Sequence, residues 1–365
     1  LRADDMTVDY LDARAKHWRI LVTQFAGSVA FRVLVLCGFL VLGSLLVMDN
    51  QMNIGQFVAS EILVLFVIES VEKLILLHET GYDVLTAIEK LGQVGDLPLE
   101  REDGIRVEEF CSEGPLEVEF RNLSYQYDDG TTPVLKDINL RIAYGEKLAV
   151  AGYDGSGKST LLQIISVVKR DFTGSLYFNG LPKQNINLRS LREHIGDLTS
   201  QEDVFKGSIR ENITLGNEHI TLQRLLQVTE DVGLGEFIRQ SPQGLETELL
   251  PGGKNIPRSV ITKLLVARAI APNPKLLALE EPHGNLNFND RLRIAKLLTE
   301  RGNPWTMVCV TTDQLMASMC DRIVVLKEGQ IVFDGSFLDV QKTDHYKRIF
   351  RTIGENGSSN TPNNN

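Results

Sequence analysis

The residues from Gly152 to Ser159 follow the pattern G-x-x-x-x-G-K-S, whose residue types and spacing suit the binding of a phosphate group. An apolar run from Leu148 to Ala151 precedes them and predicts a buried strand. The segment after them predicts a helix, because its apolar residues are helically spaced and it contains neither Pro nor Gly. In such a strand–loop–helix, backbone N–H groups converge on an anion, and the helix dipole favours negative charge there. The pattern therefore predicts a nucleotide site.

Two side chains of this loop have expected roles that follow from their chemistry. Lys158 is expected between the β- and γ-phosphates, and the Ser159 hydroxyl is expected to ligate Mg²⁺. A glycine-rich turn without a ligand is the alternative, but the bare pattern arises by chance in only about one chain in a hundred of this length. The predicted cofactor-binding residues of the loop are Gly152, Asp154, Gly155, Ser156, Gly157, Lys158, Ser159 and Thr160.

Composition bounds the class of protein. The chain has 365 residues, enough for two or three domains, and a formal net charge of −10. An acidic balance argues against a nucleic-acid-binding protein, which usually carries a basic stripe. The chain begins with Leu1, and we expect it to be the end of a longer protein. The scattered cysteines show no metal-binding spacing and predict reduced, buried thiols at Cys37, Cys111, Cys309 and Cys320.

Two apolar stretches upstream of the loop predict membrane-spanning helices. Residues 26–48 carry one charge, Arg32, and about 20 apolar residues are enough to cross the hydrocarbon layer. Residues 54–77 form the second stretch, and their helical pattern continues to Leu91, as expected of a helix that leaves the bilayer as a cytosolic stalk. The basic residues before the first stretch place both outer ends on the cytosolic side. Buried helices of a soluble protein are the alternative.

Acidic residues interrupt the second stretch. At 100° per residue, Glu61, Glu69 and Glu72 fall within about an 80° arc of one helix face. Acidic groups in a membrane helix normally face the bundle interior or water. A substrate path and, for Glu69 and Glu72, a solvated stalk face are equally consistent with this arc.

The rest of the chain predicts an α/β domain at residues 116–352. Residues 93–115 are charged, contain Gly and Pro and predict a linker, and the Ser/Asn/Gly-rich residues 353–365 predict a disordered tail. A helical region is expected at 208–239 and a helix at 260–270. Strands are expected at 116–120, 135–142, 147–151, 175–178, 195–198, 276–279, 306–311, 322–326 and 330–333.

The order of these elements resembles that of the ATP-binding cassette (ABC) exporters. Leu123-Ser-Tyr-Gln-Tyr127 matches the segment whose aromatic residue stacks on adenine, which implies this role for Tyr127; packing beside Tyr125 in a strand is the alternative. Thr199-Ser-Gln201 matches the segment whose glutamine contacts Mg²⁺ and the attacking water, which implies this role for Gln201.

A second phosphate-site motif supports the same resemblance. Leu276-Leu-Ala-Leu-Glu280-Glu281-Pro282 is an apolar strand that ends in acids, which places carboxylates at the sheet edge beside the phosphates. The resemblance implies that Glu280 lies on the metal side and that Glu281 is the catalytic general base for water. The implied metal-contacting residues are therefore Ser159, Gln201 and Glu280.

The resemblance implies an architecture and partners. Residues 1–92 would be the last two helices of a six-helix membrane domain, followed by an α/β P-loop nucleotide-binding domain in the cytoplasm. The implied cofactors are ATP and Mg²⁺. The implied partner is a second half-transporter, of the same or a different chain, with ATP held between the two nucleotide-binding domains and an unknown substrate exported across the membrane.

The chain departs from the family pattern in four places. Glu280 replaces an aspartate, Asn287 replaces another aspartate, and Thr312 replaces a histidine. In place of the signature Leu-Ser-Gly-Gly-Gln, which acts on the partner's ATP, the chain has Ile256-Pro-Arg-Ser-Val260. These departures predict ATP binding with slow hydrolysis, or hydrolysis only at a site that a better partner completes.

Two other classes of function are alternatives to this one. A nucleotide-binding regulator or partner subunit that never hydrolyses ATP is consistent with the same four departures. A soluble P-loop kinase or GTPase is disfavoured by the apolar residues 26–77 and by the segment around Gln201.

Overall fold

The computed structural model describes residues 2–97, 100, 103–127, 130, 132–199 and 203–350, with the backbone only at residues 2–5, 9, 72 and 74–79. Gln201 and the predicted tail, residues 353–365, lie outside this part of the chain. The chain divides into two compact units, Leu1–Leu99 and Glu100–Asn365.

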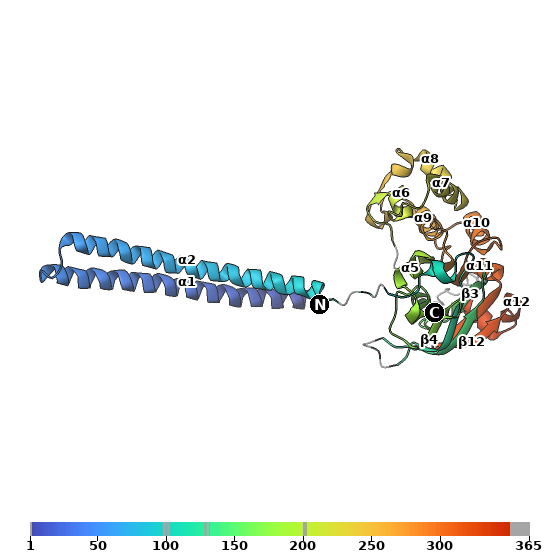
Figure 1. Ribbon diagram of the computed structural model, residues 1–365, viewed down its shortest axis with the longest axis horizontal. Coiled ribbons are helices and arrows are strands. Elements are labelled where there is room, and N and C mark those ends of the chain that lie inside the picture. The colour runs from blue at the N-terminus through green and yellow to red at the C-terminus, as the bar shows by residue number, and fades with distance from the viewer. Residues whose placement is uncertain are drawn as a thin grey trace, which may run out of the picture. The chain divides into compact units, whose positions relative to one another are not determined.

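The first unit is a pair of long antiparallel helices, α1 (Arg2–Met48) and α2 (Ile54–Gly95), joined by a short turn (Figure 1). The turn ends in a capping box. The Asn53 side chain accepts a hydrogen bond from the Gln56 backbone N–H at 2.8 Å, and the Gln56 side chain accepts one from the Asn53 N–H at 3.0 Å. By length and composition, both helices could cross a membrane, over Met6–Met48 and Ile54–Val71.

The apolar side chains of this pair point mostly outward. Leu34 and Phe66 are 71% and 63% exposed, and the contact between the helices includes Phe57, which lies against Gly43 and stacks with Phe39 at 6.2 Å. Exposed apolar faces of this extent suit a hydrocarbon environment or further helices. The expectation that Cys37 is buried is wrong, because it lies on an outward face of α1.

The acidic arc of α2 is partly described. Glu69 forms an ion pair with Lys73 one turn further along the same helix, at 3.4 Å, and both side chains are exposed. The side chain of Glu72 lies outside the described residues. This local pair gives Glu69 a counter-charge on its own helix.

The described residues of the second unit form three sheets. The largest has the order β12-β11-β3-β10-β9-β6, in which all neighbouring strands are parallel except the β11–β12 hairpin. Its strands are β3 (Lys147–Gly152), β6 (Ile195–Leu198), β9 (Leu276–Glu280), β10 (Thr306–Val310), β11 (Arg322–Lys327) and β12 (Gln330–Gly335). The antiparallel second sheet, of order β2-β1-β4-β5, comprises β1 (Val118–Tyr125), β2 (Leu135–Ile142), β4 (Thr173–Phe178) and β5 (Leu181–Pro182). The short strands β7 (Gly207–Ser208) and β8 (Glu248–Leu249) form the third.

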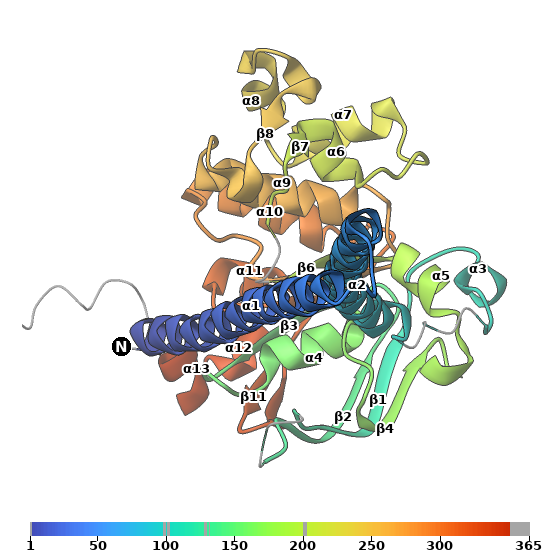
Figure 2. The same ribbon diagram turned by 90° about the vertical axis from the view of Figure 1, so that its left-hand side faces the viewer.

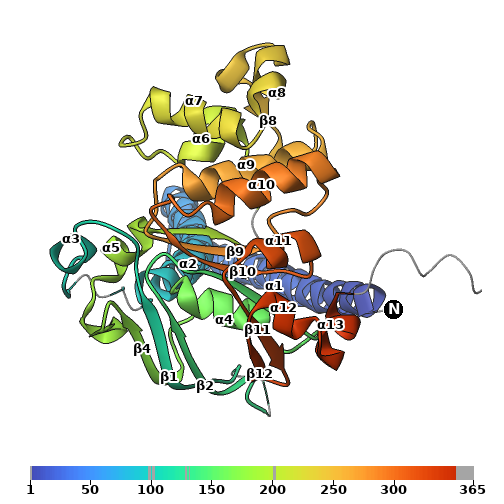
Figure 3. The same cartoon turned by 90° about the vertical axis from the view of Figure 1, so that its right-hand side faces the viewer.

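Helices cover both faces of the parallel sheet. Every residue of β3 is buried, and alternate residues belong to different cores: Leu148 packs with α4 and β1, and Ala149 packs with α9. Helices α6, α7, α8 and α9 gather together, away from β1, β2 and β4 (Figure 2, Figure 3). The helices of this unit are α3 (Val107–Phe110), α4 (Lys158–Ile165), α5 (Leu188–Glu193), α6 (Ile209–Thr214), α7 (Leu222–Asp231), α8 (Gly235–Gln240), α9 (Arg258–Ile270), α10 (Phe288–Thr299), α11 (Gln314–Met319), α12 (Phe337–Val340) and α13 (Asp344–Ile349).

The helical region expected at 208–239 comprises three separate helices, α6, α7 and α8. Leu215 and Gly216 have φ of 51° and 76° and end α6, and Gly233, with φ of 77°, separates α7 from α8. Positive φ is incompatible with a continuing right-handed helix.

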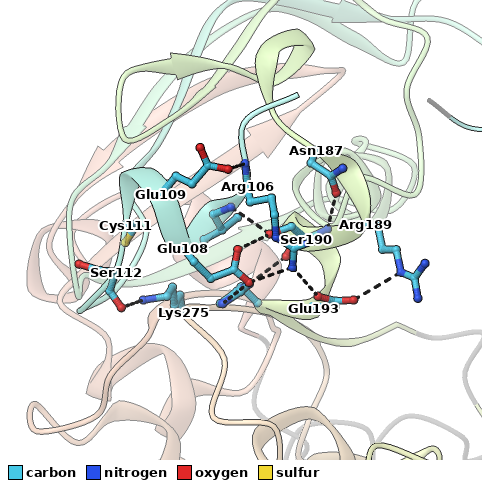
Figure 4. Close-up of polar contacts among 12 residues, drawn as sticks. Arg106, Glu108, Glu109, Cys111, Ser112, Asn187, Arg189, Ser190, Glu193 and Lys275 are labelled. Carbon is cyan, nitrogen blue, oxygen red and sulfur yellow. Dashed lines mark hydrogen bonds and ion pairs between the residues drawn. The ribbon is translucent and has the colours of Figure 1, made fainter. Parts of the chain in front are cut away.

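Part of the predicted linker is folded against the second unit. Helix α3 packs beside α5, and its Val107 is fully buried (Figure 4). The Ser190 hydroxyl accepts a hydrogen bond from the Val107 backbone N–H at 2.9 Å and donates one to Glu108 at 3.0 Å, and Arg106 lies 3.8 Å from Glu193. These contacts connect the chain just before β1 to the same core that supports β3.

Candidate functional site

The phosphate-binding loop joins β3 to α4, and two of its glycines are required by their surroundings. A Cβ atom on Gly157, whose φ is 94°, would lie 2.7 Å from the Leu135 side chain and 2.9 Å from the Val134 carbonyl oxygen. A Cβ on Gly152 would lie 2.3 Å from the Leu326 carbonyl oxygen. Both spacings are too short for any side chain, so the backbone takes this path only with glycine.

Lys158 lies inside the loop. Its ammonium group donates hydrogen bonds to the carbonyl oxygens of Gly152 at 3.0 Å and Tyr153 at 2.8 Å. Burial lowers the pKa of Lys158 below its ordinary value, and nearby carboxylates, Asp154 first, oppose that shift. The ammonium is therefore held at the N-terminal end of α4, where the helix dipole favours an anion.

Ser159 and Glu280 meet across the site. They are far apart in the sequence, yet the Ser159 hydroxyl donates a hydrogen bond to a Glu280 carboxylate oxygen at 2.5 Å. Hydroxyl and carboxylate oxygens suit Mg²⁺, which is commonly bound by one or two carboxylates together with substrate phosphates and water. Within the described part of the chain, no cluster of three or more His, Cys, Asp or Glu side chains could hold a metal ion. The Ser159 hydroxyl and the Glu280 carboxylate fit a cation that is bound together with phosphate oxygens.

Glu281 follows directly at the end of β9, in a strained conformation. Its φ is 46°, uncommon for a residue other than glycine, and its N–H donates to the Val310 carbonyl oxygen at 2.9 Å. One carboxylate oxygen accepts the N–H and the hydroxyl of Thr312 at 2.9 and 3.0 Å, and the other lies 2.7 Å from His283 Nε2. Burial would raise the pKa of Glu281, but the hydrogen bonds from His283 and from the Thr312 hydroxyl and N–H together lower it. The carboxylate is thus held as an anion.

Sheet order brings these groups together. β3, β10 and β9 are adjacent and parallel, so the loop, Thr312 and Glu281 follow their strands at the same edge. Ligands of open α/β sheets bind at this carboxyl edge. Inside the loop, the Ser156 hydroxyl is buried without a hydrogen-bond partner among the described atoms, so its polar capacity is available to an anion.

Tyr127 lies beside the start of α4. Its hydroxyl is 3.2 Å from the Thr160 hydroxyl, and its ring, 41% exposed, meets Tyr125 edge-on with centroids 5.1 Å apart. The Lys169 ammonium lies 4.4 Å from the ring centroid. The ring is therefore near the loop and also packs beside Tyr125, so the adenine-stacking role stays a prediction. The role of Gln201 also stays a prediction.

Comparison with known proteins adds independent information. Residues 135–284 match the family model described as "ABC transporter". The chain carries an ABC transporter domain. The match begins at β2, spans the loop and ends just after Glu281, so it contains most of the site described above. It confirms the resemblance predicted from the sequence.

The relatives of this ABC transporter domain are ATP-binding proteins of membrane transport. The chain is 29% identical over 340 residues to "Transport/processing ATP-binding protein ComA" of Streptococcus pneumoniae, covering 93% of this chain and 47% of that protein. It is 26% identical to "Alpha-hemolysin translocation ATP-binding protein HlyB" of Escherichia coli O157:H7, covering 88% and 46%. The chain thus spans about half the length of the curated relatives it matches.

A solved structure shares the fold. "Structure of a bacterial Atm1-family ABC exporter with ATP bound" matches with a TM-score of 0.68 at 21% identity, covering 80% of this chain and 51% of that one. The predicted fold class, a helical segment followed by an α/β ABC nucleotide-binding domain, is confirmed.

Two residues of the ABC transporter domain have contacts that the sequence reasoning missed. His283 contacts Glu281, and the only signal was its position two residues further along the chain. Asn287, noted only as a departure, caps α10, since its side chain accepts a hydrogen bond from the Asp290 N–H at 2.9 Å. Short polar side chains are favoured at helix N-caps, a signal that could have been read.

The start of α9 is the region with the largest departure. Pro257 is the N-cap residue, has no N–H and makes no side-chain cap. Arg258 follows at the first helical position and is exposed. The helix therefore begins with a proline and a charged side chain where the resemblance implies a serine and glycines.

Proposed function

We propose that this chain is the ATP-binding part of an ABC-type membrane exporter, which couples ATP binding and hydrolysis to the export of a substrate. The observation that supports this most is the convergence of the phosphate loop, the Ser159–Glu280 pair and Glu281 at one sheet edge. Relatives named for ATP binding in transport and translocation support the same proposal.

Different residues would bind the nucleotide, hold the metal ion and activate the attacking water. The loop N–H groups and Lys158 bind the phosphates, and Tyr127 stacks on the adenine. Ser159, Glu280 and Gln201 would hold Mg²⁺, which would supply positive charge to the phosphates. Glu281 accepts the proton of the water that attacks the γ-phosphorus, as a general base already held in its anionic form.

The helices of the first unit would be the last two of a membrane domain. Two helices of sufficient length and apolar composition, and relatives about twice as long as this chain, support this. The protein would then be a multi-pass membrane protein with its nucleotide-binding domain in the cytoplasm. It would pair with a second half-transporter, of the same or a different chain, so that two domains enclose ATP.

Hydrolysis is expected to be slow. Pro257 and Arg258 stand where the family has a serine and a glycine, whose donors would contact the partner's γ-phosphate. Thr312 offers neutral donors where the family has a histidine. Removing one transition-state donor typically lowers a rate by about 10²–10³-fold. The same observations favour a second candidate function, a partner subunit that binds ATP and regulates the transporter without hydrolysing it.

One experiment separates the two candidates. ATP affinity and phosphate release are measured on the complete protein in lipid, with and without Glu281→Gln. The exporter proposal expects ATP binding in both forms and turnover only in the unchanged protein, because the amide cannot accept the proton. Binding with no turnover above that of the variant would establish the regulatory subunit instead, and absence of ATP binding would contradict both.

A further inference from the structure

The imidazole of His283 contacts the carboxylate of Glu281 from the side opposite Thr312. We propose that His283 is a positioning residue for Glu281. It holds the Glu281 carboxylate in one orientation, in which the carboxylate can accept the proton of the attacking water. This inference rests on the proposed ATPase function, because the residue that His283 contacts, Glu281, is the general base of that function.

Three donors surround the Glu281 carboxylate, and they are unequally distributed. Thr312 supplies two, its N–H and its hydroxyl, and both reach the same oxygen, Oε1, at 2.9 and 3.0 Å. His283 Nε2 lies 2.7 Å from the other oxygen, Oε2. Thr312 alone therefore fixes the position of Oε1, and the carboxylate could still rotate so that Oε2 moves. With His283 in place, both oxygens are held.

The chemistry of the contact assigns the proton on the ring. An ionised carboxylate only accepts hydrogen bonds, so the hydrogen of a neutral imidazole must be on Nε2. Nδ1 is buried and has no hydrogen-bond partner among the described atoms. The contact therefore requires a hydrogen on Nε2, because the opposite tautomer, with its only hydrogen on Nδ1, could not donate to Glu281.

The backbone holds the ring where it is. Residues 281–284 form a tight turn, closed by a hydrogen bond from the Gly284 N–H to the Glu281 carbonyl oxygen at 3.1 Å, with buried Pro282 inside it. Thr262 of α9 anchors this turn, since its hydroxyl donates to the Gly284 carbonyl oxygen at 2.7 Å. The His283 side chain is only 13% exposed. Two residues of sequence separation and a strained φ at Glu281 together direct the imidazole back onto the carboxylate.

Turnover of the complete protein provides the first test. His283→Ala should lower kcat about tenfold or more with unchanged ATP affinity, because a misplaced catalytic group loses rate without losing ligand contacts. His283→Gln keeps a donor near Oε2 and should recover part of the rate. His219→Ala, which removes an exposed histidine outside the site, is the matched control and should behave like the unchanged protein.

The outcomes separate this inference from the function on which it rests. If His283→Ala turns over ATP normally while Glu281→Gln does not, the inference is wrong and the ATPase proposal stands. If the unchanged protein shows no more turnover than Glu281→Gln, the ATPase proposal fails. A measurement that needs no turnover then tests whether His283 contacts Glu281.

That measurement is the ¹⁵N spectrum of the protein labelled at its six histidines. His283→Gln assigns the signal by its loss, and ATP binding by this variant shows that it is folded. We expect a hydrogen on Nε2 of His283 and a clear change of its signal in Glu281→Gln. A signal of the opposite tautomer, or one that Glu281→Gln leaves unchanged, would overturn the proposed contact.

Discussion

Helices α4 and α9 of the ABC domain both begin without a side-chain cap, and they differ in what stands at that end. The N-cap of α4 is Gly157, with φ of 94°, at the end of a loop that closes on itself. The N-cap of α9 is Pro257, followed by Arg258. An uncapped helix N-terminus exposes N–H groups that can bind an anion. The start of α4 has the residue types that this needs, whereas the start of α9 has Pro257 and Arg258 and no glycine.

On the proposed function, the two helix starts would act on different nucleotides. By resemblance, the start of α4 binds the chain's own nucleotide and the start of α9 acts on the partner's. A positive side chain in the first turn also opposes the helix dipole, at a cost of about 0.3–1 kcal/mol, so Arg258 does not help α9 to form. We interpret the chain as one that binds ATP well and serves a partner's ATP poorly.

Gly157→Ala should have the largest effect, because it would disrupt the loop before α4 that binds ATP. The new Cβ would lie 2.7 and 2.9 Å from neighbouring atoms, in a backbone conformation disfavoured for alanine. Strain of about 1–3 kcal/mol predicts a loss of ATP affinity of roughly tenfold to a hundredfold by equilibrium binding. Gly302→Ala, where nothing lies within 4 Å of the added atom, is the control. Equal affinities for both variants would contradict the tight fit of the loop.

Placing small residues at the start of α9 should make it more like the start of α4 and raise the rate of ATP hydrolysis. The triple change Pro257→Ser, Arg258→Gly and Ser259→Gly returns small residues and N–H donors to the start of the helix. We expect turnover per dimer to rise about tenfold, since regained transition-state donors increase rate, with little change in affinity. Arg258→Ala alone, which removes the charge without adding glycines, serves as the comparison. An unchanged rate in the triple variant would show that α9 does not limit hydrolysis.

Tyr127 offers the smallest and most selective test. Base–aromatic stacking is worth about 1–3 kcal/mol, so Tyr127→Ala should weaken ATP binding by about fivefold or more. Tyr127→Phe removes only the hydroxyl near Thr160 and should bind ATP nearly as well. Tyr144→Ala, a change at an exposed tyrosine between β2 and β3, is the control. If Tyr127→Ala binds ATP normally, packing beside Tyr125 is the whole role of this ring.

Local patterns predicted much of the fold, and contacts between distant residues explain what they missed. The bounds of β2 and β6 agree with the sequence, because each is a short β-type run. The docking of α3 depends on a hydrogen bond between Val107 and Ser190, 83 residues apart, which no local pattern contains.

The candidate site divides in the same way. The loop could be predicted residue by residue because its chemistry is contiguous in sequence. The contact of His283 with Glu281 could not, since it depends on the positive φ of Glu281 and on the anchoring of the turn by Thr262. Sequence spacing gives the neighbours of a residue along a helix or strand but not across a strained turn.

ATP affinity and turnover measured on one preparation of the complete protein in lipid test the central claim most directly. The account predicts clear saturable ATP binding together with turnover below about one per second, the lower end of common kcat values. Turnover of about tens per second by this protein alone would contradict it, because a site with an altered α9 would then hydrolyse ATP as fast as an ordinary enzyme.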